Sequence, residues 1–310
     1  MEPTLPVSPE DAIAHLASSE PLLNAPLTEL TGLSQAHLEQ LKGLWTTIEP
    51  ERRRQIVRRL VELTEDDIEL SFDAIFKYLL KDSDSEVRTQ AIEGLWENEE
   101  ASRIEPLISL LEKDSSGKVQ SAAALALGKF ALLAEHGKLR SSYKNKIQQA
   151  LLAVLNDKHR SIEVRRRSLE ASASLSLPEV KQAIMEAYRG TDGRLKISSV
   201  YAMGRSCDSA WVPDLLKELS NADAEIRYEA AGALGELEEE TAVPGLIKLV
   251  SDADSDVRMA AVQALGKIGT TQARDCLKKC QNSGDESVRQ TAEQALSELE
   301  AREDPLSFKL

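Results

Sequence analysis

The sequence is poor in the residues that usually hold metal ions or build disulfide frameworks. It has four histidines and three cysteines among 310 residues, and no histidine has another histidine or a cysteine at helical spacing. Cys276 and Cys280 are four residues apart, which is a spacing that can hold zinc. Two ligands are too few for such a site, so we expect buried thiols there. The composition predicts no metal centre.

Motifs of catalysis and cofactor binding are also missing. The chain has neither of the glycine-rich phosphate loops, Gly-x-x-x-x-Gly-Lys and Gly-x-Gly-x-x-Gly. Its many carboxylates are explained by helix caps and solvated faces, and no pair stands out as acid and base. We therefore predict no catalytic residue, no cofactor and no enzymatic activity.

Long apolar runs and a secretion signal are absent as well. No run of about 18 apolar residues occurs, which argues against a transmembrane helix. The first residues lack a basic start and an apolar signal core, and an odd number of cysteines fits a reducing compartment. We therefore predict a cytoplasmic protein. A net charge of −14 disfavours generic binding to nucleic acid or to an anionic membrane.

A recurring phrase, Asp-x-Asp-x-x-Val-Arg, dominates what is present. Asp252, Asp254, Val257 and Arg258 give it in full, and steps of 31 residues in either direction reach related copies. Seven copies are marked by their apolar anchors, which are Val87, Val119, Val164, Leu195, Ile226, Val257 and Val288. Because one such unit is too small to bury its own apolar face, the period predicts stacked repeats.

Each repeat is predicted to contain two helices, which makes the fold all-α. The second helix begins at the phrase, where an aspartate or serine three residues before the anchor can cap free amides. Apolar residues follow four, seven and eight residues after the anchor, as in Ala261, Ala264 and Leu265. Gly204, Gly235 and Gly266 come next and suit a left-handed helix end.

The phrase resembles the short HEAT-like repeats of the phycobilisome-lyase type over roughly residues 70–300. The resemblance implies a ladder in which the first acidic residue and the arginine six positions later link adjacent repeats. Asp82 with Arg88 and Asp252 with Arg258 match this pattern fully, and the other copies replace one or both members. We therefore expect an incomplete ladder that serves packing. HEAT-type di-iron hydroxylases use repeated His-Glu pairs, and no His-Glu dipeptide occurs here.

The predicted architecture is an α-solenoid of about seven two-helix repeats with N-terminal capping helices. Residues 1–30 are predicted to be a mobile leader, 31–68 the capping helices, 69–300 the solenoid and 301–310 a C-terminal tail. The interval between Val119 and Val164 is fourteen residues longer than the period. The surplus falls near residues 132–146 and indicates a longer loop or a lengthened helix, used for binding or simply tolerated.

The region around this insertion inverts the charge of the chain. Between residues 138 and 167 there are nine basic and two acidic residues. The residues that we single out as partner-binding candidates are Lys138, Arg140, Lys144, Lys146, Arg165 and Arg166. Such a segment could receive an acidic protein, a phosphate or nucleic acid, or it could pair with neighbouring acidic repeats.

A second candidate surface comes from the positions two and six residues after each anchor. These positions share one helical face and vary in kind, unlike the core positions. If the second helices line the concave side, an apolar ridge forms beside Arg166 from Ile197, Tyr201, Tyr228 and Met259. Exposed aromatic and methionine side chains favour protein contacts. The alternative is that some of these side chains turn inward.

Three functions remain open from the sequence. The first is a non-enzymatic scaffold that binds a protein partner through the ridge and the basic segment. The second, implied only by the resemblance, is a phycobilin-lyase-like subunit that handles a chromophore. The third is a nucleic-acid binder, which the acidic remainder of the chain disfavours.

Overall fold

The computed structural model describes residues 8–303, and all regular secondary structure in that range is helical. The prediction of an all-α repeat protein is therefore confirmed. The chain divides into two compact units, one up to Ala150 and one from Leu151, with the division falling inside helix α9 (Ser141–Asn156). Across the described residues, no helix combines the length and the apolarity needed to cross a membrane.

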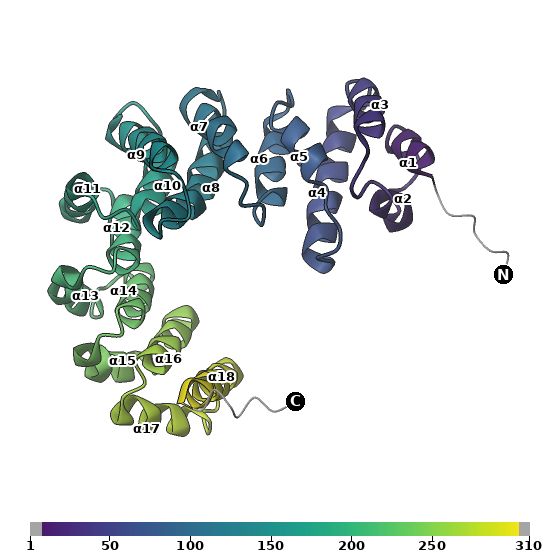
Figure 1. The fold of residues 1–310 in the computed structure, drawn as a ribbon. Helices are drawn as coiled ribbons and strands as arrows, with labels where there is room; N and C mark the ends of the chain where they lie inside the picture. Colours follow the sequence, from purple (N-terminus) through teal and green to yellow (C-terminus); the bar gives the residue numbers. More distant parts are fainter. Residues whose placement is uncertain (1–7, 304–310) are drawn as a thin grey trace. The chain divides into compact units, whose positions relative to one another are not determined.

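The first unit contains two rows of helices (Figure 1). Its helices before α9 are α1 (Pro9–Leu16), α2 (Asn24–Thr28), α3 (Gln35–Trp45), α4 (Pro50–Asp66), α5 (Asp73–Leu79), α6 (Ser85–Gly94), the 3-10 turn η1 (Ala101–Arg103), α7 (Ile104–Lys113) and α8 (Gly117–Glu135). Helix α4 packs against α6 and α6 packs against α8, so the second helices of successive repeats form one row.

The start of the chain differs from the prediction of a mobile leader. Ser8 caps α1 by accepting from the amide of Asp11, and Ile13 and Leu16 of that helix are buried. Leu27 of α2 is also buried, and α1 packs against α3. The prediction was wrong for residues 8–30, because apolar side chains in this short segment find a surface on the next helix. Residues 1–7 of the predicted leader lie outside the described residues.

The two helices predicted as caps are present and continue the stack. Arg53 of α4 pairs with Asp82 at 2.7 Å, in the same way as the arginines of the later repeats pair. Helices α3 and α4 therefore behave as a further repeat before the seven that carry the phrase. The phrase itself is absent from α4, so the sequence pattern did not reveal this.

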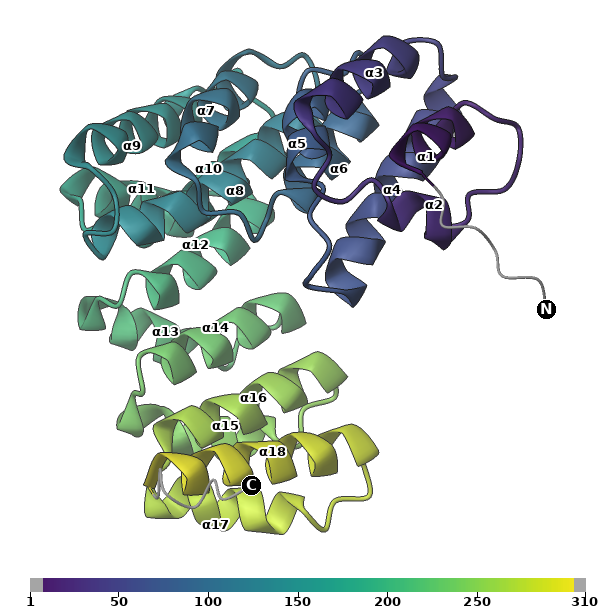
Figure 2. The same ribbon diagram turned by 45° about the vertical axis from the view of Figure 1, so that its right-hand side comes forward.

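The second unit repeats the same two-layer arrangement (Figure 2). After α9 it contains α10 (Ile162–Ser172), α11 (Pro178–Arg189), α12 (Gly193–Arg205), η2 (Ser209–Trp211), α13 (Val212–Glu218), α14 (Ala224–Glu236), η3 (Glu240–Ala242), α15 (Val243–Leu249), α16 (Ser255–Ile268), α17 (Thr271–Cys280) and α18 (Glu286–Glu303). Helices α10, α12, α14, α16 and α18 pack in succession. The predicted caps form: Asp254, for example, accepts from the amides of Asp256 and Val257.

The glycines near the ends of the second helices do not end them, contrary to the prediction. Gly204, Gly235 and Gly266 lie within α12, α14 and α16. A Cβ atom on Gly235 would lie 2.8 Å from the Cα atom of Ala264, so glycine there lets neighbouring helices approach closely. The left-handed residue comes three positions later in each repeat and is Cys207, Glu238 or Gly269.

The insertion consists of lengthened helices. Helix α8 has 19 residues and α9 has 16, whereas α6 and α7 have 10 each. A turn at residues 136–140 joins α8 to α9. At the far end α18 runs to Glu303, three residues into the predicted tail, and the rest of that tail lies outside the described residues.

Candidate functional site

The charged residues of the phrase form the expected ladder within each unit. The rungs that join an arginine to an aspartate of the next repeat are Arg53–Asp82 at 2.7 Å, Arg88–Asp114 at 2.8 Å, Arg227–Asp252 at 2.7 Å and Arg258–Asp285 at 2.7 Å. Lys196 pairs with the buried Glu218 at 3.1 Å, and Gln120 donates to a carbonyl of its own repeat. The ladder is incomplete, as predicted, and its residues are occupied in packing.

The exposed face of the second helices contains three of the four residues of the predicted ridge. Tyr201 and Tyr228 are exposed and Met259 is partly exposed. Ile197 is buried, with 6% of its surface accessible, so the prediction that it is exposed was wrong. It occupies the position two residues after the anchor, where α10 and α14 pack on either side of α12. A short aliphatic side chain is covered there, whereas the longer ring of Tyr228 reaches solvent.

Arg166 is held in a network on α10 and α12. Its Nε atom donates to the hydroxyl of the buried Ser198 at 3.0 Å, and Ser198 donates to Glu170 at 2.6 Å. Its guanidinium also pairs with Glu163 at 3.3 Å, and only 16% of the side chain is exposed. Most of its donors therefore face partners within the second unit.

The basic segment is divided between the two units and is partly neutralised. Lys138 and Arg140 are exposed in and beside the turn that joins α8 to α9. Lys144 pairs with Glu135 at 2.9 Å, and Lys146 pairs with Glu105 of α7. In the second unit, the Nε atom of Arg165 donates to the carbonyl of Leu155. The sequence left open that the basic residues pair with nearby acidic ones, and Lys144 and Lys146 do so.

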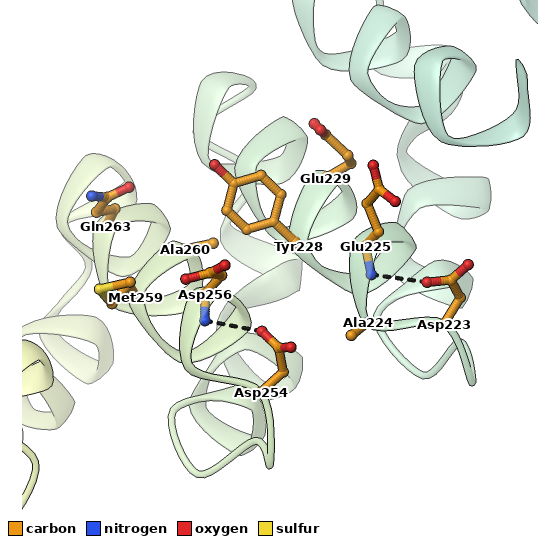
Figure 3. Close-up of a pocket in the computed structure, with 10 residues that line it drawn as sticks. All are labelled: Asp223, Ala224, Glu225, Tyr228, Glu229, Asp254, Asp256, Met259, Ala260 and Gln263. Carbon is orange, nitrogen blue, oxygen red and sulfur yellow. Dashed lines mark hydrogen bonds between the residues drawn. The ribbon is translucent and has the colours of Figure 1, made fainter. Parts of the chain in front are cut away.

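A groove of about 780 Å³ lies between the N-terminal halves of α14 and α16 (Figure 3). Its lining residues are Asp223, Ala224, Glu225, Tyr228, Glu229, Asp254, Asp256, Met259, Ala260 and Gln263. Figure 3 shows the ring of Tyr228 between Glu225 and Glu229 on one side and Met259 and Gln263 on the other. Five carboxylates and no lysine or arginine line this groove, so its charge is strongly negative.

The carboxylates of the groove differ in how well they are compensated. Asp223 and Asp254 cap their helices by accepting backbone amides at 3.0 and 2.9 Å. Glu229 has no such compensation from a helix end. Burial, together with the charges of Glu170 and Glu225, raises the pKa of Glu229 to about 7, against a smaller opposing effect of Arg166. The groove therefore holds a carboxylate whose ionised form would be stabilised by an added positive charge.

Sequence reasoning found Tyr228 and Met259 but missed the groove around them. Glu225 and Asp256 lie in the first turns of α14 and α16, and Glu229 was not singled out from the sequence. Their convergence requires two neighbouring repeats to be stacked in register. One signal in the sequence could have indicated Glu229. It lies three positions after the anchor Ile226, and no other repeat has an acidic residue at that position.

The described residues bring together no set of metal ligands. No group of three or more histidine, cysteine, aspartate or glutamate side chains in residues 8–303 is arranged to hold a metal ion. Cys280 is buried, and burial beside Cys276 raises the pKa of its thiol to about 11.

Several solved structures resemble the chain. An engineered protein is 23% identical, with 64% of this chain and 96% of that chain covered and a TM-score of 0.40. The complex of CpcE and CpcF of phycocyanin lyase from Nostoc sp. PCC7120 is 19% identical, with 64% and 79% covered and a TM-score of 0.46. Human deoxyhypusine hydroxylase in complex with glycerol is 17% identical, with 94% and 96% covered and a TM-score of 0.35.

The comparison with curated protein sequences finds no match. The comparison with protein families matches HEAT repeats over residues 72–145, 104–204 and 212–297. These ranges cover more than half of the chain and coincide with the stacked helix pairs from α5 to α18. The chain therefore belongs to the HEAT-repeat family.

Proposed function

We propose that this HEAT-repeat chain is an interaction scaffold that holds a basic segment of a protein partner in the groove between α14 and α16. The observation that carries the proposal is the lining of that groove, in which five carboxylates surround Tyr228 and Met259 without a lysine or arginine among them. A partner segment with lysine or arginine beside an apolar residue would complement both features.

Tyr228 and Met259 add apolar contact area, which the carboxylates of the groove do not provide. Tyr228 is 43% exposed and belongs to the few large apolar or aromatic residues that the described surface presents. Tyrosine is enriched in the energetically dominant positions of interfaces, and methionine adapts to irregular partners. Tyr201 lies on the preceding second helix, α12, and is proposed as a flanking contact, whereas Arg166 of α10 is occupied by Ser198 and Glu163 and has the same charge as the proposed segment.

The remaining candidates have less support. The exposed Lys138 and Arg140 could contact an acidic partner, but Lys144 and Lys146 already pair with glutamates. Nucleic acid is disfavoured, because phosphates would be repelled by the carboxylates of the groove. Enzymatic activity has no positive support from the described site.

Affinity purification from extracts of the native cell tests the proposal. The wild-type chain is compared with a variant that carries Tyr228→Ala, Glu225→Gln and Glu229→Gln, and captured proteins are quantified by mass spectrometry. We expect at least one partner to be captured about tenfold less well by the variant, since several interface contacts are lost together. The same partner should also elute from the wild-type chain as the salt concentration of the buffer is raised.

A control variant, Gln294→Ala, changes an exposed residue of α18 outside the groove and should capture the partner as well as the wild type. Circular dichroism establishes that both variants keep their helices. If every protein captured by the wild type is captured equally by the groove variant, the groove is not the binding site.

A further inference from the structure

A second groove, of about 510 Å³, lies in the first unit at the C-terminal ends of α4 and α6. Its lining residues are Val61, Thr64, Glu65, Ile68, Glu93, Gly94, Trp96 and Glu97. Ile68 is 93% exposed and Trp96 is 46% exposed, so two of the most accessible large apolar side chains of the described surface flank one groove. Such side chains grouped around a concavity indicate a contact surface.

Trp96 is held in place by its neighbours. The ammonium group of Lys129 donates to the backbone carbonyl of Trp96 at 2.9 Å and lies 5.8 Å from the centroid of its ring. Lys129 also pairs with Glu97 at 3.5 Å. Because the ring is oriented before any partner arrives, less conformational entropy is lost when a partner packs against it.

The rim of this groove is acidic. Glu65, Glu93 and Glu97 line it, and no lysine or arginine is among its lining residues. Partial desolvation, together with the charges of Glu65 and Glu86, raises the pKa of Glu93. An added cation would relieve the repulsion among these carboxylates.

The helix ends strengthen the negative potential. Both α4 and α6 point their C-terminal carbonyls toward this end of the unit, and neither has a basic residue in its last turn. Helix C-termini normally favour lysine or arginine there, because the helix dipole is negative at that end. At the end of α6, Lys129 of α8 supplies such a charge by donating to the carbonyl of Trp96, and neither helix supplies one of its own.

The shape of the groove suits a helix. One wall of the groove is a stripe on the last turns of α4 and the residues that follow it, formed by Val61, Thr64, Glu65 and Ile68. The end of α6 forms the opposite wall. From Val61 to Glu65 the stripe covers about 6 Å of helix axis, and Ile68 lies two residues after the end of α4. An amphipathic helix can lay a few apolar side chains between such walls.

We propose that the groove between the ends of α4 and α6 docks an amphipathic helix of a protein partner, with its apolar face against Ile68 and Trp96 and flanking lysines or arginines against Glu65, Glu93 and Glu97. This surface consists of first-unit residues only. It is separate from the groove proposed above, so either site can fail without the other.

Tryptophan fluorescence offers a direct test, because Trp45 and Trp211 are each only 2% exposed while Trp96 is exposed. The probe is an 18-residue peptide of leucine and lysine whose leucines share one helical face. Binding should shift the emission of the full-length chain to the blue and protect Trp96 from acrylamide quenching. The Trp96→Phe variant should lose the signal.

Matched variants separate the specific site from general attraction to an acidic chain. Replacing Glu65, Glu93 and Glu97 together by glutamine should weaken binding about tenfold, and Ile68→Ser should do so by a similar factor. Replacing Glu225, Glu229 and Asp256 by neutral amides removes the same number of carboxyl groups and should leave the Trp96 titration unchanged. This control keeps the outcome independent of the α14–α16 proposal.

Three results would overturn the inference. The first is a Trp96 emission that does not respond to the lysine peptide at millimolar concentration. The second is equal binding by a peptide in which glutamate replaces every lysine, since the rim would then select nothing. The third is a triple glutamine variant that titrates like the wild type while its helical content is unchanged.

Discussion

Gly232 and Gly235 lie three residues apart on α14, yet a methyl group would meet different surroundings at the two positions. At Gly235 the new atom would lie 2.8 Å from the Cα atom of Ala264 and 2.9 Å from its Cβ atom. At Gly232 no atom lies within 4 Å. We expect Gly235→Ala to destabilise the protein by about 2 kcal/mol through overpacking and Gly232→Ala to stabilise it by up to about 1 kcal/mol through helix propensity.

Urea denaturation followed by circular dichroism measures this difference, and the two variants serve as each other's control. They make the same chemical change on the same helix. A lower midpoint for Gly235→Ala and an equal or higher one for Gly232→Ala fit the close approach of α14 and α16. Equal shifts for both variants would contradict it.

At this scale the sequence predicted capping residues and core anchors well, because both depend on local spacing. Asp254 caps α16 and Val257 is buried, as expected. The role of Gly235 was not predictable, since glycine suits both a left-handed helix end and a close contact, and only the position of Ala264 decides between them. Burial of Ile197 likewise depends on the neighbouring helices.

Between elements, the ladder pair of Arg227 and Asp252 joins α14 to the repeat that contains α16. Two guanidinium nitrogens donate to the carboxylate at 2.9 and 2.7 Å, and 15% and 9% of the two side chains are exposed. Hydrogen bonding from Arg227 lowers the pKa of Asp252. We expect Arg227→Ala to destabilise the protein by about 2 kcal/mol at pH 7, because buried hydrogen bonds to charged groups are lost.

The sign of the pH dependence follows from the lowered pKa. The contribution of the pair is present above the ordinary pKa of aspartate, about 3.9, and is lost as the pH falls through the lower value in the folded protein. Urea midpoints measured from pH 6 to pH 2 should therefore fall less steeply for Asp252→Asn than for the wild type. Identical slopes would show that the pair contributes nothing to acid sensitivity.

The limits of sequence analysis at the element scale have one cause. The phrase identified seven second helices, but α4 carries its ladder residue Arg53 without the surrounding phrase, so the repeat formed by α3 and α4 was predicted to be a cap. The buried Ile13 of α1 has too short a helix around it to give a clear period. Both become recognisable only through the helix that they pack against.

For the whole molecule, the distribution of charge matters more than the local charge of a segment. The sequence pointed to the basic residues between 138 and 167, yet Lys146 pairs with Glu105, which is 41 residues away. The negative grooves arise because carboxylates of successive repeats converge, as Glu229 and Asp256 do. Charge counted along a linear window misses both effects, since stacking places residues of neighbouring repeats side by side.

The same stacking predicts that damage stays local. Each repeat contacts chiefly its neighbours, so its opening free energy depends on nearby interfaces rather than on the whole array. In Gly235→Ala, amide hydrogen exchange measured by mass spectrometry should quicken in α12, α14, α16 and α18, and α3 to α6 should keep wild-type rates. Gly232→Ala should quicken none of them. Uniform acceleration from α3 to α18 would instead show that the array opens as one cooperative body, in which case a partner bound to one groove would stabilise every repeat.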